Sequence, residues 1–191
     1  MIEYSRMARP RSEEKRASLL DAAADVVAER GDSAPTALIA KAAGVAEGSL
    51  FTYFRSKEEL LTELYSQLVA EAFGAVPSEL AEMRVGSREK LLAIWNSVLR
   101  WGLSSPNRWK ALRMLRLSSL VDKARRGDTQ ARGRRFLAEE FGIPDSPPGL
   151  RTRIFTAMMD LTIELVHENP KLADLYSAAG FEAFWRAVSG V

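Results

Sequence analysis

The sequence predicts an all-α protein of about nine helices. Apolar residues recur at the three- and four-residue spacing of an amphipathic helix along almost the whole chain. No segment shows the alternation of apolar and polar residues that indicates a half-buried strand. The 191 residues, of which 47% are hydrophobic, suffice for one large domain or two small ones. We expect an N-terminal three-helix domain over residues 1–57 and a larger C-terminal helical bundle over residues 58–191.

The first two helices are predicted from the residues at their ends. The first spans about 13–30, because Ser12 can cap its start and Gly31 suits the position just past its end. The second spans about 35–43 and opens on a proline, whose missing N–H costs nothing in the first turn of a helix.

A capping box marks the start of the fourth helix, which follows a third helix over about 46–54. Ser56 and Glu59 have the types and the spacing that satisfy free N–H groups at a helix start, and Pro77 ends the helix. Apolar spacing and proline or glycine breaks, Gly127 among them, predict the remaining helices. These span about 87–103, 106–122, 128–141, 149–168 and 170–189.

The composition excludes several classes of protein. The chain has no cysteine, so it can form neither disulfides nor thiolate metal sites, and it cannot use a cysteine nucleophile. No apolar run approaches the ~18–20 residues that span a bilayer. The polar, basic stretch 1–11 has no apolar core and does not read as a secretory signal. We therefore expect a cytoplasmic protein without a membrane partner.

The segment 38–60 carries the most specific pattern in the chain: a short helix, a glycine turn, a second short helix and the start of a longer one. In a helix-turn-helix the two helices cross sharply, which demands small residues such as Ala40 and Gly44, and Gly44 can also adopt a left-handed turn. Hydroxyl side chains on the second helix suit phosphate oxygens. The residues that this helix would present outward are Glu47, Gly48, Ser49, Phe51, Thr52 and Tyr53.

Lys57 lies in the first turn of the predicted fourth helix. A cation is disfavoured there by roughly 0.3–1 kcal/mol, because the helix N-terminus carries partial positive charge. Beside a DNA phosphate the same position becomes favourable, since the helix end and the lysine both attract the anion. A solvated surface lysine is the alternative interpretation.

This segment resembles the DNA-binding domain of the TetR family of bacterial repressors over roughly residues 12–62, about a third of the chain. The matching residues are Ala28-Glu29-Arg30-Gly31, Thr36, Ile39-Ala40, Ala43-Gly44-Val45, Gly48-Ser49-Leu50-Phe51-Thr52-Tyr53-Phe54 and Lys57-Glu58-Glu59-Leu60. The resemblance implies a homodimer that places two recognition helices in successive major grooves of a palindromic operator. It also implies a C-terminal domain that binds a small molecule and then releases DNA.

The resemblance also implies a contact for each matching position. Thr36, Tyr53 and Lys57 would contact phosphates, while Glu47, Gly48, Ser49 and Phe51 would face bases or the groove edge. The chain departs from the family at Phe51, where a tyrosine is usual, so one phosphate hydroxyl is missing.

Glu47 is unusual at a position that faces the groove, because a carboxylate near phosphates is unfavourable. It could accept a hydrogen bond from cytosine N4. It could instead stabilise the positive end of its own helix.

Large apolar residues of the C-terminal part are candidates for an effector chamber, since aromatic and methionine side chains can line an adaptable pocket or fill a core. Arg113 joins them as a candidate for holding an anionic group, together with Arg116. The candidate ligand-binding residues are Trp95, Val98, Trp109, Arg113, Met114, Leu117, Phe155 and Met159.

The last two predicted helices are apolar on more than one side, so each needs two packing partners. One partner can be the rest of the domain and the other a second subunit. A four-helix dimer interface follows, in agreement with the resemblance. Its candidate residues are Ile154, Met158, Leu161, Leu165, Tyr176, Ala179, Ala183 and Phe184.

The segment 84–135 forms a basic block with 14 basic and 3 acidic side chains, a net charge of +11. Three interpretations are open. The block can pair with the acidic segments 58–83 and 136–191, it can attract DNA at long range, or it can bind an anionic ligand.

An enzyme would need a catalytic site, and His167 is the only histidine. Glu164 and His167 match half of a di-iron signature that requires two such motifs and two more glutamates. We therefore expect no enzyme activity, no cofactor and no metal site. The leading hypothesis is a repressor that a small molecule releases from DNA. The alternatives are a DNA-binding regulator that answers a protein partner or no effector, and a small-molecule-binding helical enzyme.

Overall fold

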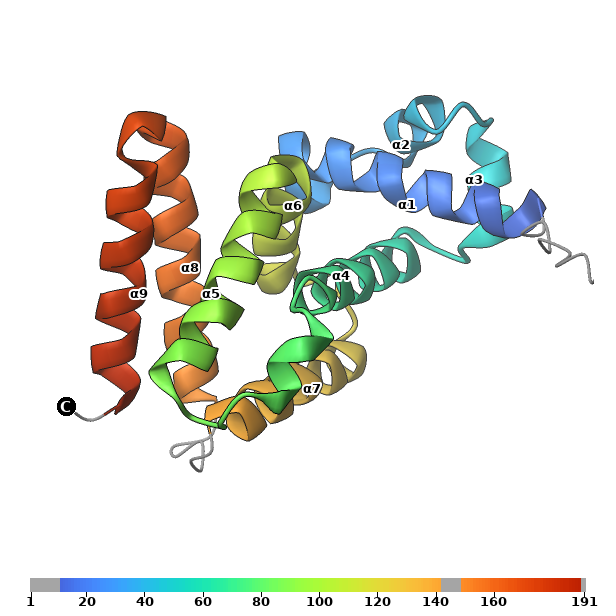
Figure 1. Ribbon diagram of the computed structural model, residues 1–191. Coiled ribbons are helices and arrows are strands. Elements are labelled where there is room, and N and C mark those ends of the chain that lie inside the picture. Colours follow the sequence, from blue (N-terminus) through green and yellow to red (C-terminus); the bar gives the residue numbers. More distant parts are fainter. Residues whose placement is uncertain (1–10, 142–148, 190–191) are drawn as a thin grey trace, which may run out of the picture.

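The computed structural model describes residues 11–141 and 149–189, and over these ranges every regular element is helical (Figure 1). The α-helices are α1 (Arg11–Arg30), α2 (Thr36–Ala42), α3 (Glu47–Tyr53), α4 (Lys57–Gly74), α5 (Arg88–Ser104), α6 (Pro106–Leu117), α7 (Lys123–Phe141), α8 (Leu150–Glu168) and α9 (Ala173–Ser189). The short 3₁₀ helices are η1 (Gly31–Ser33), η2 (Ser78–Glu82) and η3 (Pro170–Leu172). The all-α prediction is confirmed.

Two glycines make the turns of the N-terminal helices possible. Gly31, after α1, has φ 67°, and Gly44, between α2 and α3, has φ 70°; side chains rarely tolerate this left-handed region. No atom lies within 4 Å of a Cβ built on Gly44, so its backbone conformation demands glycine, and close packing does not. Ala40, at 1% exposure, is the small residue that the α2 packing requires.

The start of α4 follows the predicted capping box with one difference. Ser56 Oγ accepts a hydrogen bond from the N–H of Glu59 at 3.2 Å. The Glu59 carboxylate accepts from the N–H of Arg55 at 2.6 Å, one residue before the cap. The two side chains therefore fix the entry of the chain into α4.

Two predicted helix boundaries around residue 120 were wrong. Helix α6 ends at Leu117 instead of 122, and α7 begins at Lys123, so it runs through Gly127 without a break. The Asp122 carboxylate explains the early start of α7, because it accepts a hydrogen bond from the N–H of Arg125 at 2.8 Å.

The helices are arranged between two ends of the molecule (Figure 1). The three N-terminal helices α1, α2 and α3 lie at one end, and the long pair α8 and α9 lies side by side at the other. Helix α4 contacts α1 as well as α6 and α7, and α6 itself packs along α1. The N-terminal helices are therefore joined to the rest of the fold through α4 and α6.

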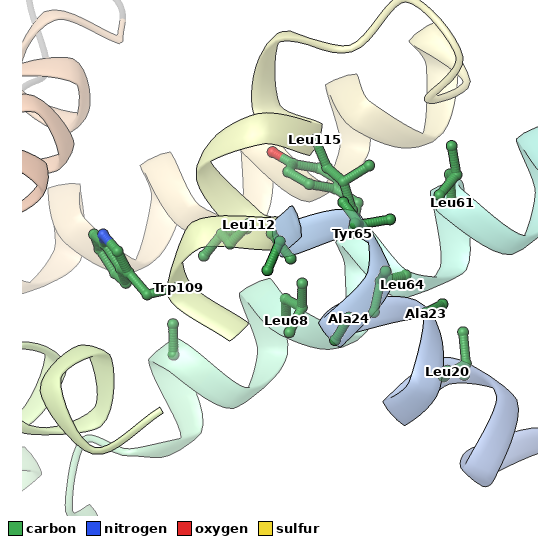
Figure 2. Packing of buried hydrophobic residues seen from close by; sticks show 14 of the residues in the cluster. Leu20, Ala23, Ala24, Leu61, Leu64, Tyr65, Leu68, Trp109, Leu112 and Leu115 are labelled. Atoms are coloured by element: carbon green, nitrogen blue, oxygen red, sulfur yellow. The ribbon is translucent and has the colours of Figure 1, made fainter. Parts of the chain in front are cut away.

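Figure 2 shows this junction, where apolar side chains of three helices meet. They are Leu20, Ala23 and Ala24 of α1, Leu61, Leu64, Tyr65 and Leu68 of α4, and Trp109, Leu112 and Leu115 of α6. All ten are buried and belong to one continuous core. The core thus runs across the expected division after residue 57, and that division stays a prediction.

Close backbone approach holds α8 against α9. A Cβ on Gly180 of α9 would overlap Oγ1 of Thr162 on α8. The Thr162 hydroxyl donates its hydrogen bond within its own helix, to the carbonyl of Met158 at 2.7 Å. The two helices therefore touch with no space for a further side chain between them.

Within the described ranges, the helices are either too short or too polar to cross a membrane.

Candidate DNA-binding helix and internal cavity

Helix α3 exposes one face and anchors the other. Leu50 is fully buried and fixes the helix to the core. Five of the predicted contact residues on α3 are exposed: Glu47, Gly48, Ser49, Phe51 and Thr52. Phe51 is 46% exposed, so its ring is accessible on this face.

The other three predicted contact residues flank this face and are half-buried. Tyr53 ends α3, Lys57 begins α4 directly after its cap, and Thr36 begins α2. Thr36 and Lys57 therefore lie at helix N-termini, where a side chain and backbone N–H groups can act together on an anion, whereas Tyr53 lies at the C-terminal end of α3.

A hydrogen bond joins two of the predicted contact residues. Thr36 Oγ1 donates to Glu47 Oε1 at 2.7 Å, across the turn between α2 and α3. One carboxylate oxygen of Glu47 is thus occupied by an intramolecular hydrogen bond. In this conformation the Thr36 hydroxyl proton is directed at Glu47, so the hydroxyl has no donor free for a phosphate.

A cavity of about 560 Å³ lies among α4, α6, α7 and α8, with Val98 of α5. Its volume falls in the ordinary range of roughly 300–1,000 Å³ for small-molecule sites. The mostly apolar lining residues are Tyr65, Val69, Ala72, Phe73, Val98, Trp109, Leu112, Leu117 and Phe155. The polar lining residues and glycines are Arg116, Arg126, Thr129, Gln130, Gly133, Arg134, Gly149, Thr152, Arg153 and Thr156. No carboxylate is among the described residues that line it.

Four of the eight predicted ligand residues line this cavity: Val98, Trp109, Leu117 and Phe155. Leu117 is 85% exposed, so it lies at the rim. Met114, on α6, is half-buried and does not line the cavity.

The predictions for Trp95 and Met159 were wrong because both side chains are core. Each is 0% exposed. Trp95 packs among three phenylalanines, with ring centroids 5.7 Å from Phe155, 6.1 Å from Phe181 and 5.6 Å from Phe184. Apolar spacing alone does not distinguish such an aromatic core from a cavity wall.

Arg113 also lies away from the cavity. It is exposed and its Nη1 lies 3.0 Å from the Glu164 carboxylate. Arg116, one turn later, does line the cavity, and its Nη1 donates to Asp160 Oδ2 at 2.7 Å. Burial raises the pKa of Asp160, and the nearby Arg116 guanidinium opposes this rise.

The polar lining residues include buried groups that lack partners in the described parts of the chain: Nε of Arg126 and Oγ1 of Thr129. Nε1 of Trp109, another lining residue, is also buried without a hydrogen-bond partner among the described residues. Burial also raises the pKa of the Tyr65 phenol, although Arg116 and a hydrogen bond with Gln130 oppose this rise, so the phenol stays neutral. These groups could serve a polar molecule inside the cavity.

Ion pairs engage five of the 14 basic residues of the basic block. Arg108 pairs with Asp21 of α1 at 2.5 Å and with Glu71 of α4 at 2.8 Å. Lys90, only 2% exposed, lies 2.6 Å from the Glu140 carboxylate. Arg88, Arg113 and Arg116 pair with carboxylates of α8 or α9. The first interpretation, pairing with acidic segments, is therefore confirmed for these residues.

The predicted dimer residues of α8 and α9 differ in exposure. Leu161 is 52% exposed, and Ala179 and Ala183 are exposed too. Ile154, Met158, Leu165 and Tyr176 are half-buried. The prediction for Phe184 was wrong, because its ring is 1% exposed inside the aromatic core. Leu175, which the sequence reasoning did not select, is 60% exposed on α9.

The described residues contain no group of three histidine, aspartate or glutamate side chains placed to hold a metal ion. His167 is exposed, and Glu164 forms the ion pair with Arg113.

A family model of bacterial regulatory proteins, the tetR family, matches residues 19–64, which hold most of α1 and all of α2 and α3. The fatty acid metabolism regulator of Bacillus subtilis (strain 168) is 32% identical over 77 residues, 40% of this chain and 39% of that protein. The transcriptional repressor KstR2 of Rhodococcus jostii (strain RHA1) is 40% identical over 81 residues, 42% of this chain and 39% of that protein. The matched stretch thus spans about two fifths of the length of these relatives.

Solved structures share the fold over nearly the whole chain. A tetR family transcription regulator from Shewanella sp. PV-4 has a TM-score of 0.78 at 23% identity and covers 91% of this chain and 97% of that one. The regulator FadR from Bacillus subtilis, in complex with stearoyl-CoA, has a TM-score of 0.64 at 21% identity over 92% and 98%. Residues 19–64 thus match the model of the tetR family of bacterial regulatory proteins, and the chain shares its fold with the solved regulators.

Proposed function

We propose that this chain is a homodimeric repressor of transcription that binds a palindromic DNA site and releases it when a small molecule enters the cavity. The position of the cavity is the observation that carries this proposal. Its walls include α4 and α6, the two helices that also pack on α1 of the N-terminal domain. A molecule in the cavity therefore touches the same helices that hold the DNA-binding end.

The contacts of α6 show how occupancy would be transmitted. Its first turn reaches α1 through Arg108 and Asp21, and through Asn107, which donates to Asp25 at 2.9 Å. The same helix lines the cavity with Trp109 and Leu112. Two recognition helices fit half-sites about 34–36 Å apart, so a small reorientation of each N-terminal domain removes the fit. An effector that prefers the reoriented state shifts the population toward release.

Fatty acyl compounds are the first effectors to test. Many residues that line the cavity are apolar, and a relative is named for fatty acid metabolism. The Bacillus subtilis FadR structure, which shares this fold, holds stearoyl-CoA.

For DNA binding we propose that exposed residues of α3 enter the major groove while Tyr53 and Lys57 hold the flanking phosphates. For dimerisation we propose the exposed apolar side chains of α8 and α9, with Leu161 and Leu175 at the centre. Such a protein would act in the cytoplasm, where its operator lies.

Recovery of bound fragments from the host's own upstream DNA tests this function. The protein is mixed with the fragment pool, with and without a library that includes acyl-CoA compounds. We expect a palindromic fragment to be bound and one compound class to release it. Failure to recover any fragment would contradict the DNA-binding proposal, and a fragment that no compound releases would contradict the effector proposal.

Two matched variants connect release to the cavity. Ala72→Phe places a ring inside the cavity, whereas Ala70→Phe places one on the exposed face of the same helix. We expect Ala72→Phe either to need at least about tenfold more effector for release or to lose DNA binding outright, since both follow from filling the cavity. Identical release curves for Ala72→Phe, Ala70→Phe and the unaltered protein would contradict the assignment of the cavity.

A further inference from the structure

Arg126 lies where the cavity meets the connection between α6 and α7. It is one of the cavity-lining residues. Its Nη2 donates to the carbonyls of Ser118 and Val121, the latter at 3.0 Å. Its Nε is buried and has no hydrogen-bond partner within the ranges that the structure describes. One guanidinium thus holds the connection with part of its donors and keeps another unused.

Thr129, one helical turn later on α7, also carries a buried polar atom without a partner in the described ranges. It also lines the cavity, its side chain is 4% exposed, and its Oγ1 has no partner within the described ranges. Residues three apart lie on the same face of a helix, so Arg126 and Thr129 are neighbours on the cavity side of α7. Buried donors without partners are rare because they lose water and gain nothing in exchange.

The charges around the cavity also favour an anionic ligand. Arg116, Arg126, Arg134 and Arg153 line it, and Asp160 pairs with Arg116 from outside the lining. The described lining residues include no carboxylate. Other lining residues are apolar, as Val69, Phe73 and Phe155 illustrate. Such a cavity favours a molecule with an apolar body and a negatively charged end.

We propose that the effector carries an anionic group, a carboxylate or a phosphate, and that this group binds to Arg126 and to the hydroxyl of Thr129. The inference rests on the proposed function and deepens it, because it names the chemistry of the effector and the residues that sense it. It does not depend on the exact length or shape of the apolar body.

The connection 118–122 links this binding event to the N-terminal domain. Ser118 Oγ donates to Asp32 Oδ2 at 2.7 Å, in the turn after α1. The N–H of Asp122 donates to Thr62 Oγ1 of α4 at 2.9 Å. An anion that draws the Arg126 guanidinium toward the cavity weakens its bonds to the carbonyls of this connection. The hydrogen bonds that join this connection to Asp32 and Thr62 are then weakened.

Direct binding measurements without DNA test the anion site. The probes are stearic acid, stearoyl-CoA and stearyl alcohol, which share a chain and differ in charge, and quenching of tryptophan fluorescence reports binding beside Trp109. We expect the charged probes to bind at least about tenfold more tightly than the alcohol, because hydrogen bonds between charged groups are strong. The ratio of acid to CoA thioester shows whether a carboxylate or the phosphates occupy the site.

Variants assign the preference to Arg126. Arg126→Gln should bring the charged probes to the affinity of the alcohol and leave the alcohol itself unchanged, which also reports that the cavity is folded. Arg126→Lys should keep part of the preference, and Thr129→Val should lose a smaller part. Arg132→Gln, on the exposed side of the same helix, should bind every probe as the unaltered protein does.

The results that overturn the inference are distinct from those that overturn the proposed function. Equal affinity of the unaltered protein for stearic acid and stearyl alcohol, no binding of any probe, or an undiminished preference in Arg126→Gln would refute the anion site. A neutral compound that nevertheless released DNA would leave the proposed function intact. The link is tested by Ser118→Ala, which should bind stearic acid at least as tightly as the unaltered protein but release DNA at severalfold lower acid concentration, because the bond to Asp32 is already absent. Unchanged release would refute the link.

Discussion

The hydroxyl of Thr36 donates a hydrogen bond to the carboxylate of Glu47 across 2.7 Å, and this bond ties the first turn of α2 to the first turn of α3. Both side chains belong to the predicted DNA-binding surface, so the surface contains an internal contact. The bond also holds a carboxylate at the N-terminus of α3, where its charge is favourable to the helix.

Glu47→Gln should bind DNA more tightly, whatever the operator sequence. The substitution removes a negative charge near the phosphates and keeps an oxygen that can accept from Thr36. The dependence of log affinity on log salt concentration should steepen by up to about one unit per subunit. Fluorescence anisotropy between low and moderate salt measures this change, with Glu29→Gln at the far end of α1 as the control. A loss of affinity confined to operators with a particular C·G pair would instead support a contact between Glu47 and cytosine N4.

Lys57→Ala should weaken binding to all operators alike. The residue begins α4, where a lysine is unfavourable unless an anion is present. Loss of a phosphate contact reduces the salt dependence by about one unit per subunit without changing the preference among sequences. Lys171→Ala, in η3 at the opposite end of the molecule, is the control. An altered sequence preference would show that Lys57 reads bases.

Gly44→Ala and Gly48→Ala should change stability in opposite directions. Gly44 has φ 70°, so alanine costs about 1–2 kcal/mol there. Gly48 lies inside α3 and nothing lies within 4 Å of an added Cβ, so alanine should stabilise by about 0.5–1 kcal/mol. Urea denaturation measures both free energies of unfolding. A stabilised Gly48→Ala that binds DNA poorly would indicate that the groove approaches the backbone closely at this position.

Asp160 should make a pH-dependent contribution to stability. Burial raises its pKa in the folded protein, whereas the unfolded value is about 3.9. Between these values the folded protein holds a proton that the unfolded chain has lost. The contribution of Asp160 is therefore fully present below about pH 3.9 and falls as pH rises through the folded pKa.

Comparison with Asp160→Asn isolates this effect from the other carboxylates. The free energy of unfolding of the unaltered protein, relative to the variant, should decline from about pH 4 upward and then become constant. Urea denaturation at a series of pH values provides the curves. Two parallel curves would mean that Asp160 titrates alike in both states.

The sequence predicted the N-terminal half of this structure well because its signals are local. Gly31, Gly44 and Ser56 each determine a backbone conformation or a hydrogen bond within a few residues of themselves. The boundary near residue 120 was missed because the Asp122 carboxylate starts α7 earlier than Gly127 suggested. A single glycine inside a helix costs only about 1 kcal/mol, which tertiary packing exceeds.

The cavity was only half predicted because its walls come from distant parts of the chain. Val98, Trp109, Leu117 and Phe155 were found through their size, but size does not separate them from the core residue Trp95. The polar lining residues were missed because arginines and threonines of α7 look like an ordinary solvated face. The available signal was the spacing of Arg126 and Thr129, which places both side chains on one face of α7.

The contact of Gly180 with Thr162 has a mechanical consequence. Two helices that touch without an intervening side chain form a stiff block, since neither can slide without a steric clash. The first turns of α8, with Thr152 and Phe155, present this block to the cavity. The connection after α6 is far more compliant, because hydrogen bonds to single side chains hold it. We therefore expect a bound molecule to displace the connection after α6 more than the α8–α9 pair, and so to move the proposed DNA-binding end formed by α1, α2 and α3.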